Sequence, residues 1–329
     1  MDSRRPRGEK VVVVVGRSHL SKLCASRAAY TVVALLDMGD LVALNVHNLL
    51  KPFVLLVLDK SIIIDAVAKE TEARKLRNTI EDHSRHLPSQ NEFSTLMNHL
   101  TESGYSLLQH SDILHNIAGL YVLYCLLDIS EELVTDRRIN IANTLRKMFE
   151  NNSKTSMSID TASVTLRISA QLIGHLARIA SIAEAEYLQA FYFPVATKLI
   201  GTTSSGYSYG SEKGDVQKLS GCFILKELAA NLPATVFTYR KQIFVLLWET
   251  VCDKASVVRE AGAEALEACL FVVSQREAMH TWLTVALGRV DVGFESKMAE
   301  KIIGSLHILD IVIGGIVIPI SELHTTMKS

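Results

Sequence analysis

The stretch VVREAGAEALEACLFVVSQRE, residues 257–277, decides the fold of this chain. Apolar side chains recur in it every three or four residues, which places them on one side of a helix. The members of this apolar stripe are Val258, Ala261, Ala265, Leu266, Cys269, Val272 and Val273. Charged residues occupy the opposite side, namely Arg259, Glu260, Glu264 and Glu267. The pattern predicts an α-helix with one buried face.

The same pattern, a pair of small residues followed by apolar residues at helical spacing, occurs five times. The five segments are His110–Ile129, Thr161–Ala180, Glu212–Leu232, Asp253–Val273 and Glu295–Gly314. When the segments are aligned on the second small residue, successive segments are about 51, 51, 41 and 43 residues apart. These distances are close to the repeat length of HEAT or armadillo units, about 40–47 residues. The aligned residues are Gly119, Ala170, Gly221, Gly262 and Ser305. We therefore predict an all-α fold, a HEAT/armadillo-type α-α superhelical solenoid.

The small pairs have a packing reason, because a bulky residue there would hold a helix away from its partner. Antiparallel partner helices are expected between the repeated segments. The sequence places them at Asn91–Leu108, Asp136–Glu150, Tyr187–Ile200 and Ala234–Val251. Pro194 is expected to kink the third of these helices or to mark its start. A long loop rich in Gly and Ser is expected over Gly201–Asp215.

The first 60 residues do not follow the repeat. Val11–Val15, Thr31–Leu36 and Val54–Leu58 are continuous or β-branched apolar runs. We predict a divergent N-terminal segment over residues 1–60, either a capping layer or a misjoined exon. A solenoid over residues 61–320 and a tail over residues 321–329 are expected to follow it.

One short stretch of this N-terminal segment offers a different hypothesis. The sequence VVVVVGRSHLSK, residues 11–22, resembles the dinucleotide-binding turn of methylenetetrahydrofolate dehydrogenases. The Gly-Lys-Pro that should follow the turn is replaced by Ser21, Lys22 and Leu23. A dinucleotide-binding domain also needs further βαβ units, for which the repeats leave no room. A dinucleotide-binding N-terminal segment is therefore the remote third option.

Charge and cysteine content restrict the partners and the compartment. The net charge is −1, so no basic excess exists to neutralise phosphates, and nucleic acid is not expected as a partner. The five cysteines are odd in number and widely spaced, which favours a reduced, cytoplasmic protein. Contact with endomembrane surfaces through partners is a separate expectation. The apolar stretch Leu41–Leu58 is interrupted by His47, Asn48, Lys51 and Pro52, and no membrane span is expected.

Motifs of catalysis are absent from the sequence. It has no GxxxxGK[ST], no kinase HRD or DFG set, no HExxH and no GxSxG. His83 and His86 lie near Glu81 and Asp82, but without a third His or a Cys they indicate a solvated helix face. We therefore predict no catalytic residue, no cofactor and no metal site.

A basic cluster lies on one predicted helix and consists of Arg137, Arg138, Arg146 and Lys147. We interpret it as a solvated face, with contact to an acidic partner as the alternative.

The stretch Lys218–Ile313 resembles the N-terminal HEAT region of the target of rapamycin (TOR) Ser/Thr kinases. LKELAANLPATVF at residues 225–237 and VREAGAEALEACLFVVSQRE at residues 258–277 carry the resemblance, and the SQRE ending is its most specific piece. Weaker, collinear similarity extends it to Asp65–Ile313, about three quarters of the chain. In the family a longer polar segment follows the SQRE helix, whereas here Ala278–Val292 is shorter. The catalytic and rapamycin-binding parts of the family are absent, so the resemblance implies a chain truncated before the kinase domain.

The resemblance implies a scaffold that acts in TOR signalling by holding a Raptor-like adaptor and a Rheb-like small GTPase. The chain alone is not expected to phosphorylate anything, although the parent family is a Ser/Thr kinase family. A freestanding HEAT-repeat adaptor unrelated to TOR is the alternative. In solenoids the second helix of each pair usually lines the binding face. The polar residues of these helices are our partner-binding candidates: Arg167, Lys218, Lys226, Glu227, Arg259, Glu260, Glu264 and Glu267.

The C-terminal part is strongly apolar from Ile302 to Ile320, with no polar capping helix after it. Solenoids need a polar cap to stay soluble. We therefore expect self-association through this end of the chain.

Overall fold

The computed structural model describes residues 49–51, 54, 66–87, 89–110, 113–127, 129, 135–152, 159–201, 212–274 and 279–315. Within these residues every regular element is helical, which confirms the predicted all-α class. The chain divides into two compact units, Met1–Ser103 and Gly104–Ser329. None of the helices that the structure describes combines the length and the apolarity that crossing a bilayer requires.

The described part of the first unit contains α3 (Ala66–Arg85) and the beginning of α4 (Gln90–Leu108). Each helix buries one apolar stripe at helical spacing: Ala73, Leu76 and Ile80 on α3, and Leu96, Met97 and Leu100 on α4.

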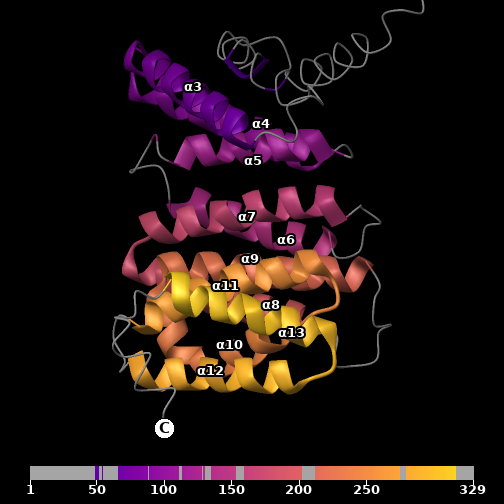
Figure 1. Cartoon of the computed structure of the whole chain (residues 1–329). Helices are drawn as coiled ribbons and strands as arrows, with labels where there is room; N and C mark the ends of the chain where they lie inside the picture. The colour runs from indigo at the N-terminus through magenta and orange to yellow at the C-terminus, as the bar shows by residue number, and fades with distance from the viewer. Residues whose placement is uncertain are drawn as a thin grey trace, which may run out of the picture. The chain divides into compact units, whose positions relative to one another are not determined.

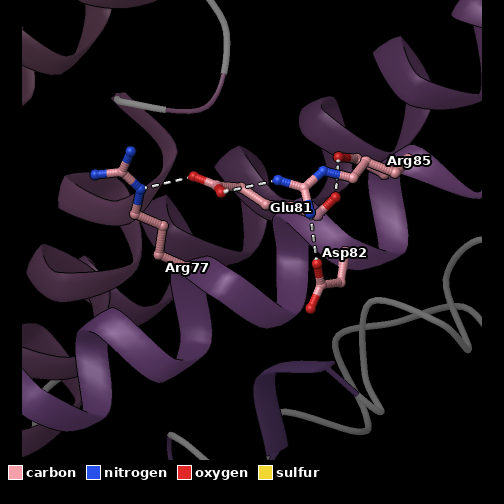
Figure 2. A network of polar contacts seen from close by, with 5 residues as sticks. Arg77, Glu81, Asp82 and Arg85 are labelled. Atoms are coloured by element: carbon pink, nitrogen blue, oxygen red, sulfur yellow. Dashed lines mark hydrogen bonds and ion pairs between the residues drawn. The ribbon is translucent and has the colours of Figure 1, made fainter.

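The polar side of α3 is a network of charged side chains (Figure 2). Arg77 Nε lies 2.8 Å from Glu81 Oε1, and Arg85 Nη1 lies 2.9 Å from Asp82 Oδ1. The carboxylates of Glu81 and Asp82, next to His83 and His86, are therefore engaged by arginines.

The second unit is a stack of helix pairs in two layers (Figure 1). The first helices of the pairs are α6 (Thr135–Asn152), α8 (Ile182–Gly201), α10 (Pro233–Val251) and α12 (Met279–Glu295). The second helices are α7 (Ile159–Ile179), α9 (Glu212–Asn231), α11 (Ser256–Ser274) and α13 (Ala299–Asp310), and a π-helical turn, η4 (Ile311–Gly315), follows α13. Helix α5 (Ile113–Leu127) extends the layer of second helices, since it packs against α7. These contacts confirm the helical solenoid.

The repeat pattern in the sequence corresponds to one layer of this stack. The five segments with small pairs are α5, α7, α9, α11 and α13, and the predicted partner helices are α4, α6, α8 and α10. Helix α12 was not predicted, although it buries Leu283, Ala286 and Val290 at helical spacing. Exposed apolar residues, Val285 and Val292, obscure that stripe in the sequence.

Pro194 neither starts nor ends a helix, contrary to one of the two expectations for it. Helix α8 begins at Ile182, five residues before the predicted Tyr187, and contains Pro194 in its interior. Near the proline the Thr197 hydroxyl donates to the Phe193 carbonyl at 3.1 Å. Of the expected loop Gly201–Asp215, Gly201 belongs to α8 and the last four residues belong to α9, which begins at Glu212, while residues 202–211 lie outside the described residues.

The small pairs lie where paired helices approach most closely. A Cβ atom on Gly221 of α9 would lie 2.7 Å from the Ala196 carbonyl oxygen and 2.5 Å from Ile200 Cγ1, both on α8. A Cβ on Gly119 of α5 would lie 2.8 Å from the Gly104 carbonyl oxygen on α4. The predicted packing reason for the small residues is thereby confirmed at these two positions.

Three cysteines, Cys125, Cys222 and Cys269, are buried among the described residues. Burial raises the pKa of the Cys269 thiol to about 12, and it raises the pKa of Cys222 as well. They therefore behave as small apolar side chains.

Several predictions for the chain ends lie outside the described residues. They are the apolar runs Val11–Val15 and Thr31–Leu36, the dinucleotide-like turn at residues 11–22 and the tail at residues 321–329. Of the predicted segment 1–60, only residues 49–51 and 54 are described, with Leu50 and Val54 buried.

Candidate partner-binding surface

Helices α7, α9 and α11 lie side by side and carry all eight candidate residues (Figure 1). The candidates divide into three groups according to their contacts. Four of them meet on the three helices, two hold a turn, and two project into solvent.

The first group is centred on the carboxylate of Glu264 on α11. Arg167 of α7 donates to both of its oxygens, at 2.7 and 3.0 Å. Lys226 of α9 donates to Glu264 Oε2 at 2.7 Å. The three side chains are between 33% and 41% exposed, so this Glu264 network lies at the surface. It links three consecutive second helices, since Arg167 reaches across α9 to α11.

An aromatic ring supports the arginine of the network. The guanidinium carbon of Arg167 lies 4.6 Å from the ring centroid of Phe223, which is buried in α9. A planar guanidinium stacks on an aromatic face while it binds a carboxylate with two parallel hydrogen bonds. The position of Arg167 is therefore fixed by both contacts.

Glu227 lies next to the network and is partly buried. Burial raises the pKa of its carboxyl, and the positive charges of Lys226 and Arg167 oppose this effect only in part. The Asn231 amide donates to the Glu227 carbonyl at 2.9 Å. Room for Glu227 is provided by α7, because a Cβ on Gly174 would overlap Glu227 Oε2. The sequence analysis did not identify this role of Gly174.

The second group, Lys218 and Arg259, holds the turn between α10 and α11. Lys218 Nζ pairs with the Asp253 carboxylate, and these side chains are 12% and 13% exposed. Asp253 Oδ1 also accepts the N–H of Ala255 at 3.0 Å. Arg259 donates to the carbonyls of Asp253 and Lys254, both at 2.8 Å. Asp253, which was not among the candidates, is the residue that joins this group.

Glu260 and Glu267 form the third group and are exposed on α11. Their spacing from Glu264 places all three carboxylates on one side of the helix. Within the part of the chain that the structure describes, neither Glu260 nor Glu267 makes an ion pair. They are thus the candidates most accessible to a partner.

Two members of the basic cluster predicted on α6 pair with acidic residues of the chain itself. Arg138 lies 3.3 Å from Glu184 of α8, and Arg146 lies 2.9 Å from Glu150. Among the described residues, no group of three His, Cys, Asp or Glu side chains is placed to hold a metal ion.

The Glu264 network makes stability depend on pH. Burial alone would raise the pKa of Glu264, but hydrogen bonds and charges from Arg167 and Lys226 outweigh it and lower the pKa. A carboxyl whose pKa is lowered by folding stabilises the protein above its unfolded pKa, near 4.3, and this stability is lost as the pH falls through the folded pKa.

We therefore predict that Glu264→Gln is less stable than the wild type at pH 7, by up to about 1 kcal/mol. The difference should shrink toward zero below about pH 4, as measured by urea denaturation across that range. Glu260→Gln, a matched change at an exposed position of the same helix, should show no such trend. A Glu264→Gln difference that stays constant with pH would contradict the assignment.

Comparison with known proteins gives the following relatives. No family model matches the chain. It is 29% identical to "Serine/threonine-protein kinase TOR" of Oryza sativa subsp. japonica over 206 residues, which is 62% of this chain and 8% of the relative. It is 25% identical to "Serine/threonine-protein kinase tor1" of Schizosaccharomyces pombe over 71% of this chain and 9% of the relative. For "Serine/threonine-protein kinase mTor" of Drosophila melanogaster the values are 24%, 58% and 7%.

These similarities confirm the resemblance to TOR kinases that the sequence motifs indicated. The chain spans less than a tenth of the length of each of these relatives.

Proposed function

We propose that this chain is a protein-interaction scaffold that corresponds to the N-terminal HEAT region of a TOR kinase and holds adaptor and regulatory proteins in TOR signalling. The observation that carries the proposal is the layer of second helices, in which α7, α9 and α11 are linked by the Glu264 network. Similarity to TOR kinases over 58–71% of the chain supports the pathway.

The network supports a binding role because it keeps a surface rigid before a partner arrives. Ion pairs and the stacking of Arg167 on Phe223 restrict long side chains that would otherwise lose conformational freedom on binding. Such preorganisation lowers the entropic cost of association.

Charge indicates what kind of partner surface fits α11. Two cations compensate Glu264, whereas Glu260 and Glu267 remain as exposed negative charges on the same side of the helix. Complementary charge steers association and selects partners. We infer that the partner presents basic side chains to α11.

By resemblance to the family, the partners proposed are a Raptor-like adaptor and a Rheb-like small GTPase. A cytoplasmic location, with endomembrane contact through these partners, is part of the same proposal.

Phosphoryl transfer needs metal-binding carboxylates and a phosphate-cradling lysine or glycine loop. We infer that this chain contributes binding to a TOR assembly and that phosphoryl transfer depends on other segments.

The test is a charge reversal on α11. The double variant Glu260→Lys/Glu267→Lys should bind a purified Raptor-like adaptor about tenfold more weakly than the wild type, with the largest difference at low salt. Its melting temperature should not change, because both side chains are exposed. Surface plasmon resonance at two salt concentrations measures the effect.

The matched control reverses two exposed glutamates on the layer of first helices, Glu249→Lys on α10 and Glu295→Lys on α12. This variant should bind like the wild type. Equal affinity of both double variants, or a wild-type chain that binds neither the adaptor nor the GTPase, would refute the proposed surface.

A further inference from the structure

Helix α5 meets α7 through a buried histidine. His175 of α7 is 4% exposed, and its ring centroid lies 4.8 Å from that of Tyr124 on α5. Helix α7 lies between α5 and α9 in the layer of second helices (Figure 1). A change at His175 therefore acts on a contact that joins α5 to the rest of the stack.

A hydrogen bond at His175 requires the neutral form of its ring. The Nη2 atom of Arg178 lies 2.6 Å from His175 Nδ1. A guanidinium has only donors, so Nδ1 must accept this hydrogen bond with its lone pair, and the ring proton is on Nε2. An imidazolium carries a proton on each nitrogen and could not accept it. The structure therefore holds His175 as a neutral imidazole.

The neighbouring helices do not favour a positive charge on this ring. Helix α5 contains no Asp, Glu, Lys or Arg, and the second half of α7 contains no acidic residue. From α9, Glu227 reaches α7 at Gly174, on the side away from α5. From α6, Arg138 brings a further cation to the C-terminal end of α7, where it pairs with Glu184 of α8. Among the described residues, α5 and the adjoining part of α7 thus supply no carboxylate to His175.

Protonation of His175 would break the arrangement around it. The imidazolium would lose the hydrogen bond from Arg178 and would place two positive charges side by side. Burial adds to this cost, because a charged group taken out of water needs a compensating partner. Arg178 is exposed and can turn into solvent, whereas the imidazolium escapes burial only if the contact with Tyr124 opens.

We propose that His175 and Arg178 form an acid-sensitive contact, in which neutral His175 keeps α5 docked on α7 and proton uptake by His175 releases α5. The proposal does not rest on the scaffold function. It adds to that function a way in which acidification shortens the layer of second helices.

The sign of the effect follows from the burial. When α5 is released, the histidine is exposed and takes up a proton near the ordinary pKa of histidine, about 6.5. The docked state binds this proton less readily. The contact therefore contributes its full stability above about pH 6.5 and loses it as the pH falls below this value. The equilibrium constant for opening should rise by up to about tenfold for each pH unit in that range.

Amide hydrogen exchange of the full chain, followed by mass spectrometry, tests the proposal because it reports the opening of each helix separately. Protection of the α5 amides, corrected for the intrinsic pH dependence of exchange, should fall at least threefold between about pH 6.5 and pH 5.5. Protection of α9 and α11 should not change over this range.

Two variants at the contact separate titration from packing. His175→Asn keeps an acceptor for Arg178 but cannot titrate, so protection of α5 should no longer depend on pH. Its matched control is His307→Asn on α13, which should retain the fall of the wild type. Melting temperatures at about pH 7.5 confirm that both variants are folded.

Arg178 is tested by charge. Arg178→Gln removes the cation beside the ring, so the loss of α5 protection should shrink to less than twofold. Arg178→Lys keeps both the charge and a donor and should behave like the wild type. Because Arg178 is exposed, neither change disturbs the core.

Three results would overturn the proposal. The first is protection of α5 that stays constant from about pH 7.5 to pH 5.5. The second is a parallel loss in α9 and α11, which would show global acid unfolding. The third is a fall that persists in His175→Asn, which would assign the pH dependence to His110 and His115, whose rings stack at 3.9 Å. No partner protein enters the experiment, so its failure is independent of the proposed function.

Discussion

Gly221→Ala is expected to lower the free energy of unfolding by about 1–3 kcal/mol, the usual cost of overpacking at a tight contact. The added methyl group would lie 2.7 Å from the Ala196 carbonyl oxygen and 2.5 Å from Ile200 Cγ1, so α8 and α9 must move apart. These two helices form one of the most extensive contacts in the stack. Urea denaturation followed by circular dichroism measures the change.

Gly288→Ala is the matched control, because it makes the same chemical change in the interior of α12. A Cβ on Gly288 meets nothing within 4 Å. Alanine should therefore stabilise this helix by about 0.5–1 kcal/mol through its better helix propensity. The two substitutions should have opposite signs, and equal effects would show that Gly221 is not a packing position.

The opposite signs illustrate which parts of the fold could be read from the sequence. Gly221 belongs to a small pair inside an apolar stripe, and the pattern alone indicated that a partner helix lies against it. Gly288 follows no such pair and lies in α12, which was not predicted. Helix periodicity is a local property, so it is visible in sequence wherever the apolar stripe is unbroken.

Contacts between repeats could not be predicted in the same way. Arg167 and Glu264 are 97 residues apart, and their meeting depends on how α7, α9 and α11 are aligned in the stack. No local pattern encodes that alignment. Sequence reasoning placed both residues on second helices but could not show that they pair.

Burial also separates candidates that look alike in the sequence. Lys218 and Lys226 are both lysines of α9, yet Lys218 is 12% exposed in its pair with Asp253, whereas Lys226 is 35% exposed. Pairs with little exposure fix structure, and exposed pairs contribute little to stability. Glu260 and Glu267 are recognised as the most accessible of the candidates only after these pairs are known.

The last helix pair leads to the second prediction, which concerns the oligomeric state. Most of the exposed large apolar side chains of the described residues lie on or between α12, α13 and η4. They are Val285, Val292, Phe294, Met298, Ile303, Leu306 and Ile313, and each is between 38% and 62% exposed. An apolar surface of this kind is normally covered by another protein surface.

We expect a second copy of the chain to cover this surface, so that the purified protein is a dimer at micromolar concentrations. The double variant Val292→Lys/Leu306→Glu should shift it to a monomer and raise the dimer dissociation constant at least about tenfold, because it places charges in an apolar interface. Size-exclusion chromatography with light scattering across a dilution series measures both states.

Val245→Lys, which replaces a 55% exposed valine of α10, is the control and should leave the dimer intact. A wild-type chain that is monomeric at the highest concentration would exclude this interface, and a dimer that survives the double variant would place the contact on another face.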